Sequence, residues 1–179
     1  MGEGEYRFCP QCGTPLATRE ARPRCPACGF VRYRNPIATV AGVLLSRDAA
    51  LPAAGKSVTP AEASHLLLVR RTGRRAGQWC IPCGYIEYGE EIRAAAAREI
   101  LEETGLVVTA ETVYAVHSNF HDPADLTVGI WFLTRYGSGR LRPGDDAARA
   151  EFFPIGDPPE PLAFPTDREV LCALQAARG

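Results

Sequence analysis

The stretch from Gly84 to Leu106, GYIEYGEEIRAAAAREILEETGL, constrains the fold of this chain more than any other. Its centre predicts one helix from about Glu91 to Thr104. Acidic residues gather at the expected start, where the helix dipole favours negative charge. Gly105 follows, and glycine commonly ends a helix in the left-handed conformation. The helix is also expected to be covered on two sides, because a second apolar stripe runs along it, formed by Ala94, Ala97 and Leu101.

Carboxylates lie near the end of this expected helix, on the face that is apolar one turn earlier. At about 100° per residue, Glu99, Glu102 and Glu103 fall within one sector of about 100°. Carboxylates gathered there repel one another unless a cation lies among them. Clustered oxygen ligands suit Mg²⁺ or Mn²⁺. The alternative is a solvated acidic face on which Arg98 pairs with Glu102.

The same stretch resembles the Nudix box, G-x5-E-x7-R-E-U-x-E-E-x-G-U with U an aliphatic residue, at every specified position. The resemblance implies a metal-dependent hydrolase of a nucleoside diphosphate linked to another moiety. It implies that Glu99, Glu102 and Glu103 are ligands of Mg²⁺ or Mn²⁺, and that Glu99 is a candidate base. The carbonyl group of Gly84 is a further expected ligand.

The resemblance also implies supporting roles for other residues. Arg98 is expected to orient the glutamates, and Glu90 to be structural. In this family one glutamate, in the box or in a later loop, activates water. Outside the box, Glu151 is the first candidate for such an acid and Asp146 is the second.

Residues 1–36 are expected to form a separate module, because the pattern CPxCG occurs in them twice. Two such knuckles supply four thiolates to a tetrahedral Zn²⁺, and the glycine after each lets the backbone turn. The module resembles a zinc ribbon, and a closed site of four cysteines is structural. The alternative is two disulfides or free thiols. The expected zinc ligands are Cys9, Cys12, Cys25 and Cys28.

A third CxxC, Cys80 and Cys83, leads into the box. The segment resembles the family pattern G-x-W-x-x-P-G-G, with Cys83 where a glycine is common. A redox role is disfavoured, because no helix start follows to lower a thiol pKa.

The rest of the chain predicts an α/β/α sandwich around a mixed sheet, over residues 37–179. Strands are expected at 37–46, 65–71, 107–117, 126–136 and 151–154, with a loop or insertion at 48–64 between the first two. Thr166 and Asp167 are expected to cap a closing helix that runs to about Ala177, with Cys172 in the core. His117 and His121 are candidates for contact with substrate.

Composition and charge narrow the partners. The 179 residues are 46% hydrophobic with a net charge of −1, which gives no reason to expect a surface that binds nucleic acid. No stretch is apolar enough to span a membrane or serve as a secretory signal, so we expect a cytoplasmic protein that binds a small nucleotide. A homodimer stays open.

Substrate is harder to predict. A zinc ribbon before a Nudix domain resembles NADH pyrophosphatases, but their S-Q-P-W-P-F-P motif is replaced here by SNFHDP at 118–123. The ribbon, the entry segment 33–36 and the segment 162–164 look more like Nudix enzymes that cleave FAD or ADP-ribose and release AMP. An NADH or NAD-type pyrophosphatase, a ligand-sensing module without turnover and a nucleic-acid module stay open as alternatives. The intact box argues against the second.

Overall fold

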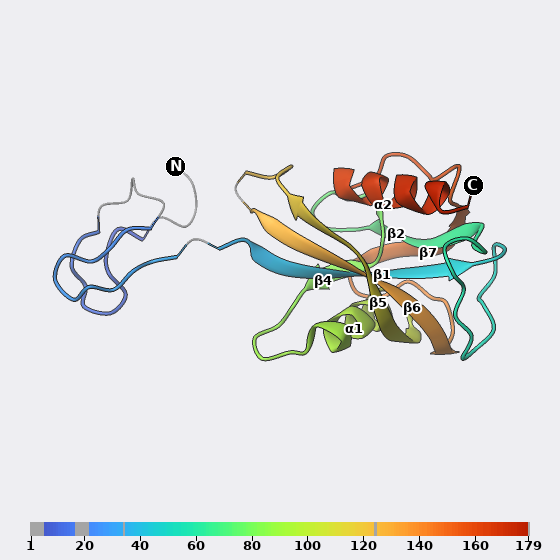
Figure 1. Cartoon of the computed structure of the whole chain (residues 1–179), viewed down its shortest axis with the longest axis horizontal. Helices are drawn as coiled ribbons and strands as arrows, with labels where there is room; N and C mark the ends of the chain where they lie inside the picture. The colour runs from blue at the N-terminus through green and yellow to red at the C-terminus, as the bar shows by residue number, and fades with distance from the viewer. Residues whose placement is uncertain (1–5, 17–21, 34, 124, 179) are drawn as a thin grey trace.

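The computed structural model describes residues 6–16, 22–33, 35–123 and 125–178. Its centre is a mixed sheet, with α1 (Ile92–Thr104) and α2 (Pro165–Ala176) on opposite sides of it (Figure 1). This arrangement confirms the predicted sandwich. The strands are β1 (Ile37–Ser46), β2 (His65–Arg71), β3 (Trp79–Cys80), β4 (Cys83–Tyr85), β5 (Leu106–Asn119), β6 (Thr127–Gly139) and β7 (Ala147–Pro154).

Strand β1 lies at the middle of the sheet, and its residues from Val40 onward are buried. It pairs in parallel with β6 on one side. On the other side it pairs antiparallel with β4 at Thr39–Ala41 and with β2 at Leu45–Ser46. The hairpin predicted from β1 and β2 is therefore present, although its pairing is short. The segment that joins β2 to β4 includes β3, which pairs with β2, and Pro82, whose carbonyl accepts a hydrogen bond from the N–H of Gly42 in β1.

Helix α1 has the ends that the sequence predicts. The carboxylate of Glu91 accepts hydrogen bonds from the backbone N–H groups of Arg93 and Ala94, and Gly105 ends the helix with φ of 71°. A methyl group on Gly42 of β1 would overlap the side chain of Ile100. The missing side chain therefore lets the helix pack directly onto the central strand.

The predicted second covered side of α1 is wrong. Ala94 and Leu101 are exposed, and Ala97 is only half-buried. The helix buries one face, which includes Ala95 and Ile100, against the sheet. Short apolar side chains such as alanine can face solvent at little cost, so their spacing alone does not show a contact.

Helix α2 begins differently from the prediction. Pro165 occupies its first turn, Phe164 precedes it, and no side chain caps the helix. Asp167, predicted to cap the helix, instead lies within its first turn and is buried, with 1% of its surface exposed. Cys172, predicted to be in the core, is exposed. The amphipathic face of α2 is turned so that Val170, Leu171 and Leu174 fill the core.

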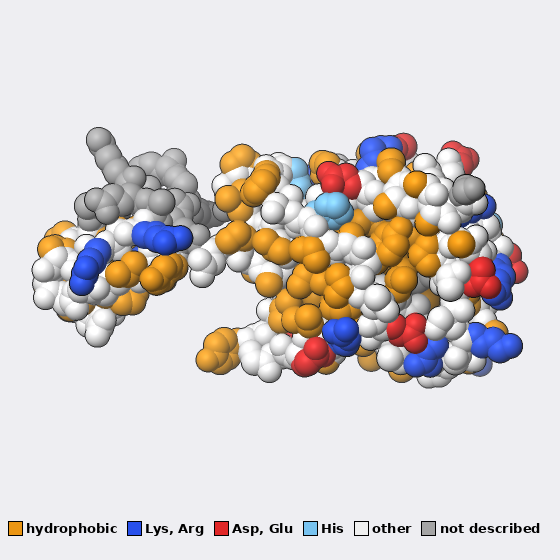
Figure 2. Space-filling model, viewed as in Figure 1, with side chains coloured by type: hydrophobic (Ala, Val, Ile, Leu, Met, Phe, Trp, Pro, Cys, Tyr) orange, Lys and Arg blue, Asp and Glu red, His pale blue; other side chains and the backbone are white. Residues whose placement is uncertain are grey.

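The sequence analysis missed the two short strands β3 and β4, and it predicted only the last half of β7. Strands of two or three residues, such as β3 and β4, carry too few residues for an alternating pattern. Strand β7 pairs with β2 along most of its length. On the face shown in Figure 2, hydrophobic side chains gather over the centre of the sheet domain, and acidic and basic side chains lie mostly along its margins.

Candidate active site

The end of α1 brings two glutamates against β4. The carboxylate of Glu99 lies so close to Gly84 that a methyl group at that position would overlap it. Glu103 has only 2% of its surface exposed, and its Oε2 accepts a hydrogen bond of 3.1 Å from the backbone N–H of Cys83. The helix and the short strand therefore meet through carboxylates rather than through apolar side chains. Buried carboxylates of this kind need compensating partners.

Arg98 links these carboxylates to the start of the helix. Its guanidinium donates to both carboxylate oxygens of Glu90, at 2.8 and 3.0 Å. It also donates to Glu99 at 2.7 Å, to Glu102 at 3.0 Å and to the backbone carbonyl of Tyr85 at 3.0 Å. The ion pair between Arg98 and Glu102, which is expected for a solvated acidic face, is present. It is one of five hydrogen bonds that Arg98 donates. The planar guanidinium fixes the side-chain positions around it.

The electrostatics around the glutamates disfavour their charged form. Burial raises the pKa of Glu103 well above its usual range, and the neighbouring Cys80 and Asp146 raise it further. Burial also raises the pKa of Glu99, although the guanidinium of Arg98 opposes that effect. A cation placed among these oxygens would favour the ionised forms.

Of the two acids proposed outside the box, the structure brings only Asp146 to this cluster. Its carboxylate pairs with Arg71 at 2.6 Å, and its charge acts on both Glu99 and Glu103. The backbone N–H of Gly144 also bonds to the carbonyl of Glu103, so this loop is attached to the end of α1. Glu151, in contrast, faces solvent on β7.

A cavity of about 150 Å³ adjoins the carboxylates and shares Cys83 and Gly84 with them. Among the residues that line it are three arginines, Arg71, Arg74 and Arg75. The other lining residues are Thr39, Val40, Ala41, Tyr85, Asn119, His121, Asp122, Asp125, Thr127, Gly129, Trp131, Phe164, Thr166 and Asp167.

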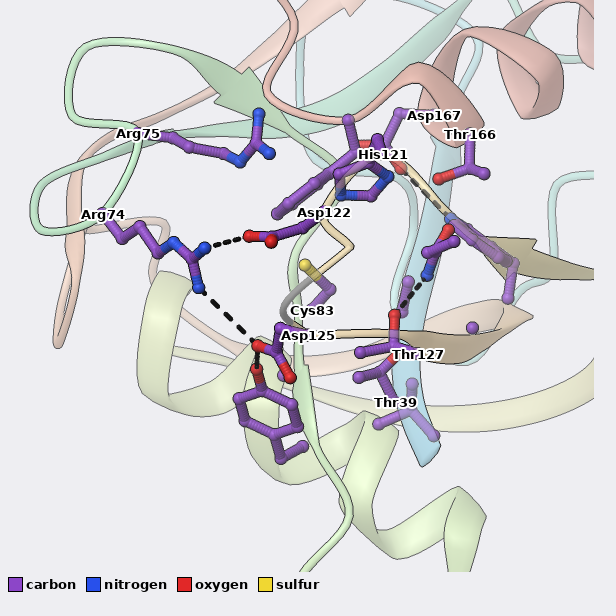
Figure 3. A pocket seen from close by; sticks show the side chains of 18 of the residues that line it. Thr39, Arg74, Arg75, Cys83, His121, Asp122, Asp125, Thr127, Thr166 and Asp167 are labelled. Atoms are coloured by element: carbon purple, nitrogen blue, oxygen red, sulfur yellow. Dashed lines mark hydrogen bonds and ion pairs between the residues drawn. The ribbon is translucent and has the colours of Figure 1, made fainter. Parts of the chain in front are cut away.

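Figure 3 shows Arg74 and Arg75 on one side of this cavity and Thr127 and Thr166 on the other. Arg74 forms ion pairs with Asp122 and, at 3.6 Å, with Asp125. These pairs join the loop after β2 to the loop after β5, and all three residues line the cavity.

Phe164 and Trp131 supply the aromatic part of the lining. The guanidiniums of Arg71 and Arg75 lie over the ring of Phe164, at 5.6 and 5.5 Å from its centroid. His121 packs against the same ring at 5.5 Å. A phenyl ring in contact with guanidinium groups forms a wall that is both apolar and electropositive.

Asp167 holds Trp131 in place. One oxygen of Asp167 accepts from the indole Nε1 at 3.3 Å, and the other accepts from the backbone N–H of Ile81 at 3.1 Å. Burial raises the pKa of Asp167 to about 7, against these two hydrogen bonds, which lower it. Sequence reasoning missed this role because a Thr-Asp pair before an apolar run also fits a helix cap.

The two histidines predicted as candidates for contact with substrate lie in different surroundings. His121 lines the cavity, whereas His117 pairs with Glu169 at 3.1 Å and packs against Trp131. Cys83 is half-buried, and the neighbouring Cys80, together with desolvation, raises the pKa of its thiol well above its usual range. A raised thiol pKa lowers the fraction of thiolate, which is the nucleophilic form.

The N-terminal cysteines form a second candidate metal centre. Gly13 and Gly29 adopt φ of 73° and 76°, so each CPxCG turns as the sequence predicts. Two Sγ–Sγ distances are 3.5 and 3.6 Å, close to the roughly 3.8 Å expected around a tetrahedral zinc with Zn–S bonds of about 2.3 Å. All four sulfurs lie within 4.8 Å of one another, and they belong to Cys9, Cys12, Cys25 and Cys28.

Among the described residues, these cysteines are the one group of three or more ligand atoms that lie this close together. The glutamates of α1 are spread more widely. The two candidate centres therefore differ in kind, since one is a closed sulfur site and the other an open set of carboxylates.

Comparison with known proteins identifies the class. A family model of the NUDIX domain matches residues 52–174. The chain therefore belongs to the Nudix family.

Individual relatives agree with this assignment. An ADP-ribose pyrophosphatase of Methanocaldococcus jannaschii is 38% identical over 100 residues, which cover 55% of this chain and 59% of the relative. The NAD-capped RNA hydrolase NudC of Stutzerimonas stutzeri is 28% identical over 177 residues, which cover 97% of this chain and 57% of the relative. The chain thus spans less than two thirds of the length of either relative.

A solved structure of a NUDIX hydrolase from Nitrosomonas europaea shows the same fold, with a TM-score of 0.73 and 24% identity over 95% of this chain and 91% of that one. Within the described residues, no helix has the length and apolar character needed to cross a membrane.

Proposed function

We propose that this chain is a Mg²⁺- or Mn²⁺-dependent pyrophosphohydrolase that cleaves the diphosphate of a nucleoside diphosphate linked to another moiety. The observation that carries the proposal is the placement of Glu99 and Glu103 beside a cavity lined with arginines. Carboxylates can hold a hard cation, and guanidiniums can bind phosphate oxygens. Gly84 lies against the carboxylate of Glu99 and lines the same cavity as the arginines, so a diphosphate could contact both kinds of group.

The donor set fits a hard cation. Glu99, Glu102 and Glu103 would supply carboxylate oxygens and Gly84 a backbone carbonyl. Their spread agrees with an ion that takes several ligands from water and substrate phosphates. When bound, such a cation polarises phosphoryl oxygens and lowers the pKa of a water ligand. The raised pKa values of Glu99 and Glu103 support this assignment, because buried carboxylates without a cation would tend to hold protons.

Other residues of the chain would support the reaction. Arg98 is a positioning residue, because its five hydrogen bonds hold carboxylates and a backbone carbonyl rather than open space. For the proton of the attacking water, Glu99 and Asp146 are the candidate acceptors. Asp146 displaces Glu151 as the favoured acid outside the box, because it acts on the cluster and Glu151 faces solvent.

We propose FAD or ADP-ribose as substrate, with AMP as one product. Phe164, from the segment that resembles enzymes acting on these compounds, lines the cavity, and two guanidiniums lie over its ring. A relative named ADP-ribose pyrophosphatase has the higher identity of the two described above. Residues 118–123 lack the motif of NADH pyrophosphatases.

An NAD-type diphosphate is the second candidate, because relatives named NAD-capped RNA hydrolase match almost the whole chain, ribbon included. In either case we propose that residues 1–36 form a ribbon with a structural Zn²⁺ and that residues 37–179 form the hydrolase domain.

A substrate screen tests the proposal. ADP-ribose, FAD, NADH and NAD-capped RNA would be incubated with the protein and Mg²⁺ or Mn²⁺, and the products identified by mass. We expect kcat/KM for ADP-ribose or FAD to exceed that for NADH and for nucleoside triphosphates. A preference for NADH or NAD-capped RNA would favour the second candidate, and a triphosphate that releases pyrophosphate would contradict both.

A further inference from the structure

Two buried polar atoms of the described residues have no hydrogen-bond partner. They are Oδ1 of Asn119 and Oγ1 of Thr166. Asn119 has 8% of its surface exposed and Thr166 has 6%. Both residues line the same cavity, although they come from the end of β5 and the start of α2. A buried polar group without a partner destabilises a fold, because the loss of its contact with water is not offset by a hydrogen bond. Two such groups in one cavity indicate that a ligand supplies the missing partners.

The chemistry of each atom defines what it can bind. The Nδ2 group of Asn119 donates to Oγ1 of Thr127 at 2.7 Å, so its Oδ1 is left as an acceptor. The hydroxyl of Thr166 can donate or accept. The neighbouring Asp167 does not compete, because both of its oxygens already accept hydrogen bonds. The complementary ligand therefore presents a donor to Oδ1 of Asn119 and either a donor or an acceptor to the hydroxyl of Thr166.

The shape of the cavity restricts the ligand further. Its volume of about 150 Å³ is below the roughly 300–1,000 Å³ of pockets that enclose a whole drug-sized molecule. It therefore suits one end of a dinucleotide. Trp131, fixed by Asp167, and Phe164 give it aromatic walls that favour a planar ring.

We propose that Asn119 and Thr166 recognise the adenine of the substrate. The exocyclic amino group would donate to Oδ1 of Asn119, and the hydroxyl of Thr166 would donate to the adjacent ring nitrogen. Guanine fits less well, because its edge presents a third polar group that these two residues do not satisfy. The inference rests on the proposed function, since it takes the diphosphate to lie at the Gly84 end of the cavity.

Direct binding tests the assignment without turnover. Calorimetry in buffer without divalent cations would give Kd for three probes: ADP, purine riboside 5′-diphosphate, which lacks the amino group, and nicotinamide mononucleotide. For wild type we expect ADP to bind at least about 10-fold more tightly than purine riboside 5′-diphosphate. Asn119→Leu should abolish this difference, because it removes the acceptor that reads the amino group.

Thr166 offers a matched pair of variants. Thr166→Val has nearly the same shape and no hydroxyl, and should weaken ADP binding about 10-fold. Thr166→Ser keeps the hydroxyl and should stay within about 3-fold of wild type. The melting temperature of Thr166→Val should equal or exceed that of wild type, because the variant removes an unpartnered buried hydroxyl. A purely structural threonine would give a lower melting temperature with no selective loss of binding.

The outcomes separate this inference from the proposed function. Unchanged ADP binding in Thr166→Val and Asn119→Leu would overturn the inference even if the wild type cleaves diphosphates. Loss of binding to nicotinamide mononucleotide rather than to ADP would overturn the choice of adenine. The expected binding pattern in a protein that cleaves no diphosphate would instead refute the proposed function alone.

Discussion

Replacing Glu103 with glutamine separates a metal ligand from a structural carboxylate. The change keeps the shape of the side chain and an oxygen that can accept from the N–H of Cys83. It removes a charge from a position that is 2% exposed, where burial raises the pKa of the carboxyl group well above its usual range. Without divalent cations, we therefore expect Glu103→Gln to be at least as stable as wild type at pH 8.

The sign of the pH dependence follows from the same shift. A carboxyl group whose pKa is higher in the folded state binds more protons folded than unfolded. Its contribution to stability is therefore lost as pH rises from the ordinary value of 4.5 toward the folded-state pKa. Glutamine does not titrate, so it makes no pH-dependent contribution to stability. The stability advantage of the variant should therefore grow between pH 5 and pH 8.

Bound metal should reverse the order of stability, so that wild type becomes more stable than Glu103→Gln. An ion present at about 100 times its Kd stabilises the folded state by about 2.7 kcal/mol. For a chain of this size that amounts to roughly 5–11 °C in Tm. Wild type should gain this increment from Mn²⁺, and Glu103→Gln should gain little of it. Turnover should fall at least about 100-fold, or about 2.7 kcal/mol in activation free energy.

Differential scanning calorimetry with and without Mn²⁺, together with steady-state kinetics on ADP-ribose, measures these effects. Glu102→Gln is the matched control, since its side chain is 46% exposed and pairs with Arg98 at 3.0 Å. It should also lose turnover, but its metal-free stability should change by less than about 1 kcal/mol. The metal assignment is refuted if both variants keep turnover within a few-fold of wild type and retain the Mn²⁺ increment.

Three other predictions concern separate parts of the molecule. Gly84→Ala should cut turnover and lower Tm, because its methyl group displaces the carboxylate of Glu99; a variant with wild-type kinetics would contradict that packing. For Asp167, whose pKa is about 7 against an ordinary 3.8, stability should decline by roughly 4 kcal/mol between about pH 4 and pH 7. Asp167→Asn should flatten this profile in pH-dependent melting, and parallel profiles would exclude the assignment. Elemental analysis should find one Zn²⁺ per chain, and zinc-free protein with disulfides between the ribbon cysteines would rule out the ribbon site. Its expected ligands are Cys9, Cys12, Cys25 and Cys28.

The box helix could be predicted because several local signals agree there. The acids at its start, the glycine at its end and the stripe of small residues indicate the same boundaries, and the structure places α1 at Ile92–Thr104. The turns of the cysteine knuckles could be predicted equally well, because each CPxCG forms its turn from residues that are adjacent in sequence. Local chemistry of this kind needs no tertiary information.

The cavity could not be predicted in the same way, because its residues meet only after folding. Asn119 and Thr166 are far apart in the chain, and nothing in their flanking sequence distinguishes them from ordinary polar residues. Asp167 shows how a local signal can mislead. Its place before an apolar run fits a helix cap, yet the packing of α2 on the sheet directs its carboxylate to Trp131. The position of Asp146 beside the cluster likewise depends on tertiary structure, because the N–H of Gly144 in its loop bonds to the carbonyl of Glu103.

The charges around α1 explain why this arrangement suits a cation-dependent site. Arg98 donates to Glu90 through Nε and Nη2, and Arg71 pairs with Asp146. Each of these guanidiniums therefore already has a carboxylate partner. Glu99 and Glu102 share the remaining nitrogen of Arg98. The negative charge of the glutamates at this end of α1 therefore exceeds the positive charge of the described side chains nearby. A diphosphate adds further negative charge at the same place. Divalent cations can neutralise both at once, which joins the ionisation of the glutamates to the binding of substrate.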